Sequence, residues 1–207
     1  QLSLVFHYRK ALKKGTIKKP AKVGTDYEHP SVTVQLPIYN ELYVVERLID
    51  AVALLDWPKD KLEIQVLDDS TDETVNLIAK KVEEWQAKGL DIQHIQRKDR
   101  KGFKAGALQY GTAIAKGEFI AIFDADFVPQ PDFLQGSVPH FEQDEKIGVV
   151  QTRWGHINEK YSMLTKLQAF GLNTHFNVEQ NGRFQGGHFL NFNGTAGVWR
   201  KSCIADA

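Results

Sequence analysis

Apolar runs and amphipathic segments alternate along this chain from residue 31 onward. The apolar runs have the length of strands, and the segments between them carry apolar residues at helical spacing. The pattern predicts strands at 32–38, 62–67, 92–95, 119–123 and 147–151, and helices at 41–55, 73–87, 105–115 and 131–141. Such alternation indicates an α/β fold with a mostly parallel sheet flanked by helices, because parallel strands need long crossover connections.

The pattern weakens toward the end of the chain. A helical face runs from Ser162 to about Val178, and residues 181–187 are polar and rich in glycine, which predicts a loop. Residues 189–199 mix aromatic side chains with Gly and Asn and fit no single element. The clear prediction therefore covers residues 31–151.

Charge is unevenly distributed along the chain. Residues 1–24 hold seven basic and no acidic side chains, whereas the other 183 residues hold 19 basic and 26 acidic ones, a net charge of −7. A basic arm can bind nucleic acid or anionic lipid headgroups, or it can be a solvated tail with no ligand. The order apolar, aromatic, basic over residues 2–10 is typical of the cytoplasmic end of a membrane helix and favours the membrane over nucleic acid. We expect a juxtamembrane arm at 1–30 and a domain at 31–207 on the cytoplasmic face of a membrane, in an integral membrane protein whose spans lie outside this chain.

The single cysteine, Cys203, excludes an internal disulfide framework and fits a reducing compartment. No apolar run approaches the roughly 18 residues of a membrane span. The composition, 42% hydrophobic and 25% charged, is that of a soluble globular domain.

Polar side chains cluster directly after the predicted strands. In parallel sheets, ligands bind at the carboxyl ends of the strands. The residues at that edge are Pro37, Tyr39, Asn40 and Glu41 after the first strand, Asp68, Asp69, Ser70 and Asp72 after the second, and Asp124 and Asp126 after the fourth.

Asp124 and Asp126 are two positions apart at the end of an apolar strand. Two carboxylates this close repel each other, and a hard divalent cation such as Mg²⁺ or Mn²⁺ relieves the repulsion. Taken alone, the pair is a weak motif and is better explained as a cap or turn after a strand, where Asp is common. Both interpretations stay open at this point.

Three other features point to an anionic, planar ligand. The basic segment 100–106 precedes a predicted helix, where phosphate binds well, although it also fits a solvated loop. Asp69 can accept hydrogen bonds from an amide or imide N–H, whereas Asp72 is better explained as a helix cap. Tyr39 can stack on a base or pack in the core.

Four motifs follow one another in a recognisable order: Pro37-Ile38-Tyr39-Asn40-Glu41, Leu67-Asp68-Asp69-Ser70-Thr71-Asp72, Lys104-Ala105-Gly106-Ala107-Leu108 and Phe123-Asp124-Ala125-Asp126. The set resembles the family 2 glycosyltransferases, which have a GT-A, Rossmann-like fold. The motifs at 150–154, 192–197 and 199–200 make it most similar to the cellulose-synthase-like group, in its β-mannan and glucomannan synthase branch.

The resemblance implies a role for each motif residue. The donor nucleotide sugar would be bound by Pro37, Tyr39, Glu41, Asp69, Lys104 and Asp124. Tyr39 and Asp69 would hold the base, and Lys104 the diphosphate. Asp126 would ligate Mg²⁺ or Mn²⁺ together with Asp124. The acceptor side would include Trp154, Asn193, Gly194 and Thr195.

The resemblance also implies a reaction: inverting, metal-dependent transfer of a hexose from UDP-glucose or GDP-mannose to a growing β-linked glucan, mannan or glucomannan. The family's catalytic base, an Asp in a Thr-Glu-Asp-like motif, would follow residue 207. Two alternatives are a non-catalytic nucleotide-sugar-binding module and a sugar-phosphate nucleotidyltransferase. The latter normally has a Gly-rich basic loop where this chain has residues 37–41.

Overall fold

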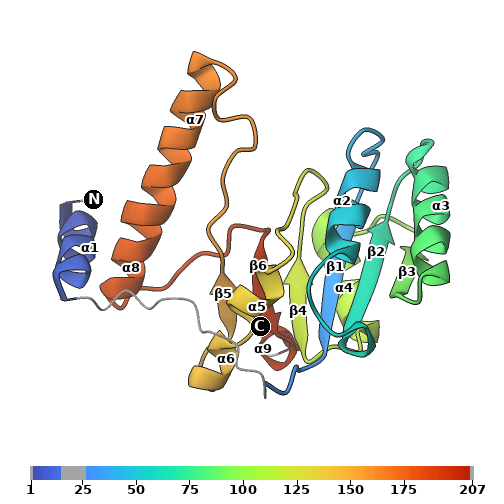
Figure 1. Cartoon of the computed structure of the whole chain (residues 1–207), viewed down its shortest axis with the longest axis horizontal. Helices are drawn as coiled ribbons and strands as arrows, with labels where there is room; N and C mark the ends of the chain where they lie inside the picture. The colour runs from blue at the N-terminus through green and yellow to red at the C-terminus, as the bar shows by residue number, and fades with distance from the viewer. Residues whose placement is uncertain (1, 15–26, 206–207) are drawn as a thin grey trace. The chain divides into compact units, whose positions relative to one another are not determined.

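A computed structural model describes residues 2–14 and 27–205 of the chain (Figure 1). Contacts divide it into two compact units. Of the described residues, 27–151 and 194–205 form the sheet unit, and 2–14 and 152–193 form the helical unit. The expected arm at 1–30 includes residues 15–26, which lie outside the described residues, so its boundary with the domain stays a prediction.

The sheet unit is built on six strands in the order β3-β2-β1-β4-β6-β5. They are β1 (Val32–Ile38), β2 (Leu62–Asp68), β3 (Asp91–Gln96), β4 (Phe119–Ile122), β5 (Val149–Gln151) and β6 (Gly197–Arg200). The first four are mutually parallel, whereas β6 runs antiparallel to both β4 and β5. The mostly parallel sheet predicted from the sequence is confirmed. β6 was not predicted, and it joins β5 to the parallel strands.

Helices cover the sheet, and all seven residues of β2 are buried. They are α2 (Val45–Ala53), α3 (Thr74–Ala87), α4 (Phe103–Ile114), α5 (Phe133–Ser137), α6 (His140–Gln143) and α9 (Lys201–Ala205), with the 3₁₀ turn η1 (Lys59–Lys61). Two predicted helices differ from the structure. The one expected from residue 41 begins at Val45. The one expected over 131–141 is divided before Pro139, which cannot donate the backbone hydrogen bond that a continuous helix requires.

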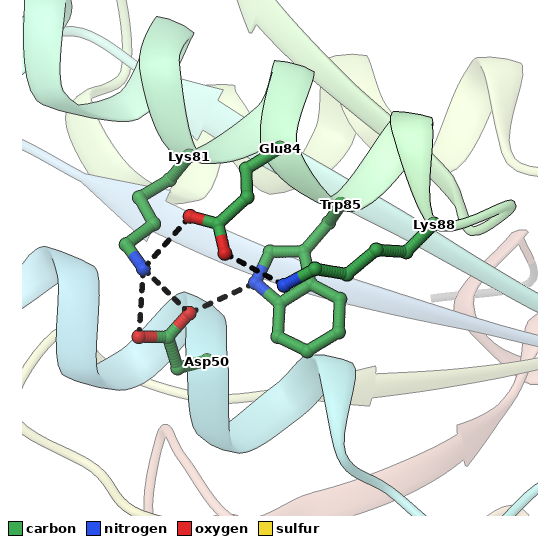
Figure 2. Close-up of polar contacts among 5 residues, drawn as sticks. All are labelled: Asp50, Lys81, Glu84, Trp85 and Lys88. Carbon is green, nitrogen blue, oxygen red and sulfur yellow. Dashed lines mark hydrogen bonds and ion pairs between the residues drawn. The ribbon is translucent and has the colours of Figure 1, made fainter.

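A polar network joins α2 to α3, the helices that follow β1 and β2 (Figure 2). The carboxylate of Asp50 accepts hydrogen bonds from Lys81 Nζ at 2.9 Å and Trp85 Nε1 at 2.8 Å. Lys81 and Lys88 both pair with Glu84, and the Lys88 ammonium lies 4.0 Å from the Trp85 ring centroid. Solvent screens these partly exposed ion pairs, so each of them is weak. They fix the two helices side by side.

The helical unit contains α1 (Leu2–Lys14), α7 (Met163–Thr174), the π-helix η2 (His175–Gln180) and α8 (Asn181–Gln185). The helix predicted over 162–178 is confirmed and begins at a Ser162–Thr165 capping box. The loop predicted over 181–187 is wrong for residues 181–185. Gly182 allows α8 to approach α1 closely, since a Cβ there would lie 2.6 Å from Leu4 O. Within the described ranges, no helix is both long and apolar enough to cross a membrane.

Candidate nucleotide-sugar site

One pocket of about 470 Å³ opens at the carboxyl ends of β1 and β4. We call it the sheet pocket. It is lined by Pro37, Ile38, Tyr39, Glu41, Asp69, Arg100, Lys104, Ala107, Asp124, Ala125 and Asp126. All six residues expected on the donor side, and both expected at the metal, are among them. Residues up to 89 positions apart in the sequence are thus brought around one cavity.

The loop after β1 is fixed by Asn40. Its φ of 55° lies in the left-handed region, which Asn tolerates better than most residues. Its backbone N–H donates to Ser70 Oγ at 2.9 Å, and its side-chain oxygen accepts from the Thr71 N–H at 2.9 Å. The loops after β1 and β2 are therefore tied together, which sets the position of Tyr39.

Tyr39 is 39% exposed, and the guanidinium of Arg100 lies 3.2 Å from its ring centroid. Tyr39 is thus a surface residue of the pocket and not part of the core. One face of its ring carries a cation–π contact, worth roughly 0.5–1 kcal/mol at an exposed site. A planar base stacking on Tyr39 would share this surface with Arg100.

Asp69 is held by Arg97, a residue that the sequence motifs did not identify. Arg97 Nε donates to Asp69 Oδ1 at 2.9 Å, and Arg97 Nη2 donates to Asp69 Oδ2. The Asp69 side chain is only 6% exposed, and the Arg97 side chain is only 10% exposed. Arg97 also donates to the carbonyls of Lys101 and Phe103. The sequence did offer one indication of this role, because Arg97 directly follows β3, the strand that pairs with β2.

The segment held by Arg97 requires a glycine in α4. A Cβ at Gly106 would lie 2.0 Å from Lys101 O and 2.7 Å from Arg97 Nη1. Gly102, with φ of 75°, reverses the chain just before α4. This close packing positions Lys104, in the first turn of α4, at the pocket.

The remaining acids after β2 are structural. Asp68 is 2% exposed and accepts from the Ser70 N–H at 2.9 Å, and its Oδ2 lies 2.7 Å from His94 Nε2. Burial raises the pKa of Asp68, but the hydrogen bonds from His94 and Ser70 outweigh it and hold the pKa below its usual value. Asp72 Oδ1 accepts from the Thr74 N–H at 3.0 Å, so Asp72 bonds the start of α3 from one residue before Glu73, the N-cap of that helix.

Lys104 connects the loop after β4 to the chain before β6. Its ammonium donates to Asp124 and, at 2.9 Å, to the carbonyl of Gly194. The Asp124 N–H in turn donates to Thr195 Oγ1 at 2.9 Å. Of the residues expected on the acceptor side, Thr195 therefore lies directly beside Asp124, and Gly194 is linked to Asp124 through Lys104.

The other two acceptor-side residues belong to the helical unit. Trp154 packs edge-on against Phe176, with ring centroids 5.6 Å apart. Asn193 Oδ1 accepts from Gln180 Nε2 at 3.2 Å. The structure thus divides the expected acceptor set between the two units.

Four carboxylates line the sheet pocket, those of Glu41, Asp69, Asp124 and Asp126. Burial raises the pKa of Glu41, and the negative charges of Asp126 and Asp124 raise it further. Within residues 2–14 and 27–205, no cluster of three or more His, Cys, Asp or Glu could hold a metal by itself. Asp124 and Asp126 offer carboxylate oxygens, the ligand type that Mg²⁺ favours, and Mg²⁺ commonly takes the rest of its coordination from water and substrate phosphate.

A parallel sheet with basic and acidic groups gathered at its carboxyl edge is characteristic of α/β proteins that bind nucleotides. Residues 33–205 match Glycosyl transferase family 2, and the chain belongs to this family. The GT-A fold expected from the sequence is confirmed by solved structures.

Named relatives agree with this assignment. The chain is 47% identical over 184 residues to probable glucomannan 4-beta-mannosyltransferase 7 of Oryza sativa subsp. japonica, covering 87% of this chain and 32% of the relative. It is 42% identical over 190 residues to glucomannan 4-beta-mannosyltransferase 1 of Cyamopsis tetragonoloba, covering 90% of this chain and 36% of the relative. The chain therefore spans about a third of the length of these relatives.

A solved structure with the same fold is the mannosyltransferase PcManGT from Pyrobaculum calidifontis in complex with GDP-Man and Mn²⁺. The TM-score is 0.71 at 25% sequence identity, and the match covers 99% of this chain and 54% of that chain.

Proposed function

We propose that this chain forms the donor-binding part of an inverting, metal-dependent hexosyltransferase that extends a β-linked polysaccharide. The observation that carries the proposal is the convergence on one pocket of Tyr39, Asp69, Lys104, Asp124 and Asp126. Of the two donors considered, GDP-mannose is favoured over UDP-glucose. The support is that the relatives are glucomannan 4-beta-mannosyltransferases and that the structure of the similar mannosyltransferase contains GDP-Man.

The pocket has groups suited to each part of such a donor. The Tyr39 ring offers a stacking surface for the base, beside Asp69. Lys104 offers an ammonium for the diphosphate. Asp124 and Asp126 offer carboxylate ligands for Mg²⁺ or Mn²⁺, which would neutralise charge developing on the departing nucleoside diphosphate. Attack by an acceptor hydroxyl from the opposite face of the sugar would give the β-linkage.

Acceptor and membrane complete the proposal. The acceptor sugar would lie near Gly194 and Thr195, which contact Lys104 and Asp124. We place the whole protein on the cytoplasmic face of a membrane because residues 1–24 hold seven basic and no acidic side chains, and anionic lipid headgroups on that face attract such a segment.

A thermal-shift experiment tests the donor site. The protein is heated with GDP or UDP, each with and without Mn²⁺, and with Mn²⁺ alone. We expect the largest rise in Tm with GDP plus Mn²⁺, since a ligand at 100 times its Kd adds about 2.7 kcal/mol to the stability of the folded state. Absence of a shift with either nucleotide would refute the donor site. A larger shift with UDP would keep the site and reject GDP-mannose as donor.

A catalyst and a binding module differ in turnover. GDP-mannose incubated with Mn²⁺ and a β-mannan oligosaccharide should give GDP and an elongated oligosaccharide when the reaction is run with the full-length protein. Donor binding without either product would favour the non-catalytic module.

A further inference from the structure

A second pocket lies within the helical unit, between α1 and α8. Its volume is about 300 Å³, and it is lined by His7, Lys10, Ala11, Lys14, Gln185 and Gly186. We call it the helical pocket. It shares no residue with the sheet pocket. Leu4 approaches Gly182 closely, and this contact holds α1 against α8 next to the helical pocket.

The wall contributed by α1 is basic because of residue spacing. His7, Lys10 and Lys14 recur at three- and four-residue intervals, which puts them on one face of the helix. Ala11 lies among them and is 4% exposed, so this small side chain is covered by its neighbours while the basic groups surround it. The His7 ring stands edge-on to the ring of His188, with centroids 6.4 Å apart.

The described lining of this pocket contains no carboxylate. Among the described residues of the helical unit, Glu179 is paired with His175 and Arg183, and neither Lys10 nor Lys14 forms an ion pair. Two carbonyls in the last turn of α8 are already bonded within the chain, since Arg183 O accepts from His188 N–H at 2.9 Å and Phe184 O accepts from Gly187 N–H at 3.1 Å. The ammonium groups therefore have charge available for a ligand.

We propose that the helical pocket binds a phosphate group. Lysine ammoniums bind phosphate as point charges, and an adjacent imidazole and the Gln185 amide can add hydrogen bonds. The volume, at the lower end of the roughly 300–1,000 Å³ of small-molecule sites, suits a phosphoryl group better than a whole nucleotide sugar.

The neighbouring face of α1 points to a phospholipid headgroup as the source of that phosphate. This face carries, at three- and four-residue intervals, the apolar residues Leu2 and Phe6 followed by the basic residues Arg9 and Lys13. Leu2 is 89% exposed and Phe6 is 62% exposed. Exposed apolar side chains followed by basic ones are characteristic of helices that lie at a membrane surface.

Two matched double variants test the proposal in the 207-residue protein. Lys10→Gln with Lys14→Gln removes two charges from the pocket. Arg9→Gln with Lys13→Gln removes two charges from α1 outside it. Binding of inorganic phosphate is measured by calorimetry against chloride at equal ionic strength. Flotation is measured with phosphatidylcholine vesicles with and without phosphatidic acid, and circular dichroism verifies that each variant is folded.

We expect the pocket variant to lose phosphate affinity by roughly tenfold or more, and the control to stay within about twofold. Flotation that requires phosphatidic acid, falls more in the pocket variant and is inhibited by free phosphate assigns the site to a lipid headgroup. Phosphate binding without flotation keeps the site and assigns it to a soluble phosphate compound. Equal losses of phosphate affinity in the two double variants would overturn the proposal. Binding of phosphate that is no tighter than binding of chloride would overturn it as well.

Discussion

Lys104, in the first turn of α4, donates a hydrogen bond to the carboxylate of Asp124, which follows β4. The same ammonium donates to Gly194 O at 2.9 Å, and Thr195 accepts from the Asp124 N–H. One lysine therefore joins the expected diphosphate, metal and acceptor sides of the pocket. A bound donor would redistribute this pair, because the phosphates attract Lys104 while the cation attracts Asp124.

Lys104→Gln should weaken GDP binding by about 10- to 100-fold, because a hydrogen bond to a charged group contributes roughly 1.5–3 kcal/mol. Binding of guanosine, which has no phosphate, should change little. Calorimetry with both ligands measures the difference. Lys101→Gln is the matched control, since Lys101 is exposed in the same segment and does not line the pocket. Equal weakening by the two variants would argue against a diphosphate role for Lys104.

Asp126→Ala should abolish the effect of Mn²⁺ on GDP binding and lower the apparent Mn²⁺ affinity at least about tenfold. The fold should be unchanged, because Asp126 is exposed. Titration of Mn²⁺ by electron paramagnetic resonance measures the affinity directly. Asp132→Ala, at an exposed aspartate outside the pocket, should behave as the wild type. A retained metal response in Asp126→Ala would locate the cation elsewhere.

Arg97→Met should lower the free energy of unfolding by about 3 kcal/mol, because it leaves the buried Asp69 carboxylate without its partner. The double variant Arg97→Met with Asp69→Leu should regain part of that loss, since it removes both charges. Urea unfolding of the wild type, Arg97→Met, Asp69→Leu and the double variant gives the coupling energy between the two residues. Additive losses would show that the pair is not coupled in the folded state.

Asp68→Asn should lower the free energy of unfolding by about 1–3 kcal/mol at neutral pH, because Asp68 is buried and hydrogen-bonded. The folded-state pKa of Asp68 is below its usual value. Its stabilisation is therefore present above about pH 4 and is lost as the pH falls through the folded-state pKa. The difference between wild type and variant should shrink in acid. Urea unfolding across this pH range measures it, and a difference that does not vary with pH would contradict the prediction.

Local patterns were sufficient for the elements that position the site. β4 is a continuous apolar run, whereas β1 and β2 alternate apolar with polar residues, and all three form strands within a residue or so of the predicted bounds. The residues after them were expected at one edge because parallel strands end on the same side. The residues Tyr39, Lys104 and Asp126 indeed line one pocket. What each of them binds stays a prediction.

The sequence by itself determined the alternation of strands and helices and the polar residues at the strand ends, because hydrophobic periodicity and turn chemistry are local properties. Only the tertiary structure decided that Arg97 holds Asp69, that β6 joins the sheet beside β4, and that residues 181–185 form a helix against α1. These outcomes depend on contacts between segments far apart in the chain. No local pattern specifies such partners, since each pairing is selected by the packing and hydrogen bonding of the whole fold.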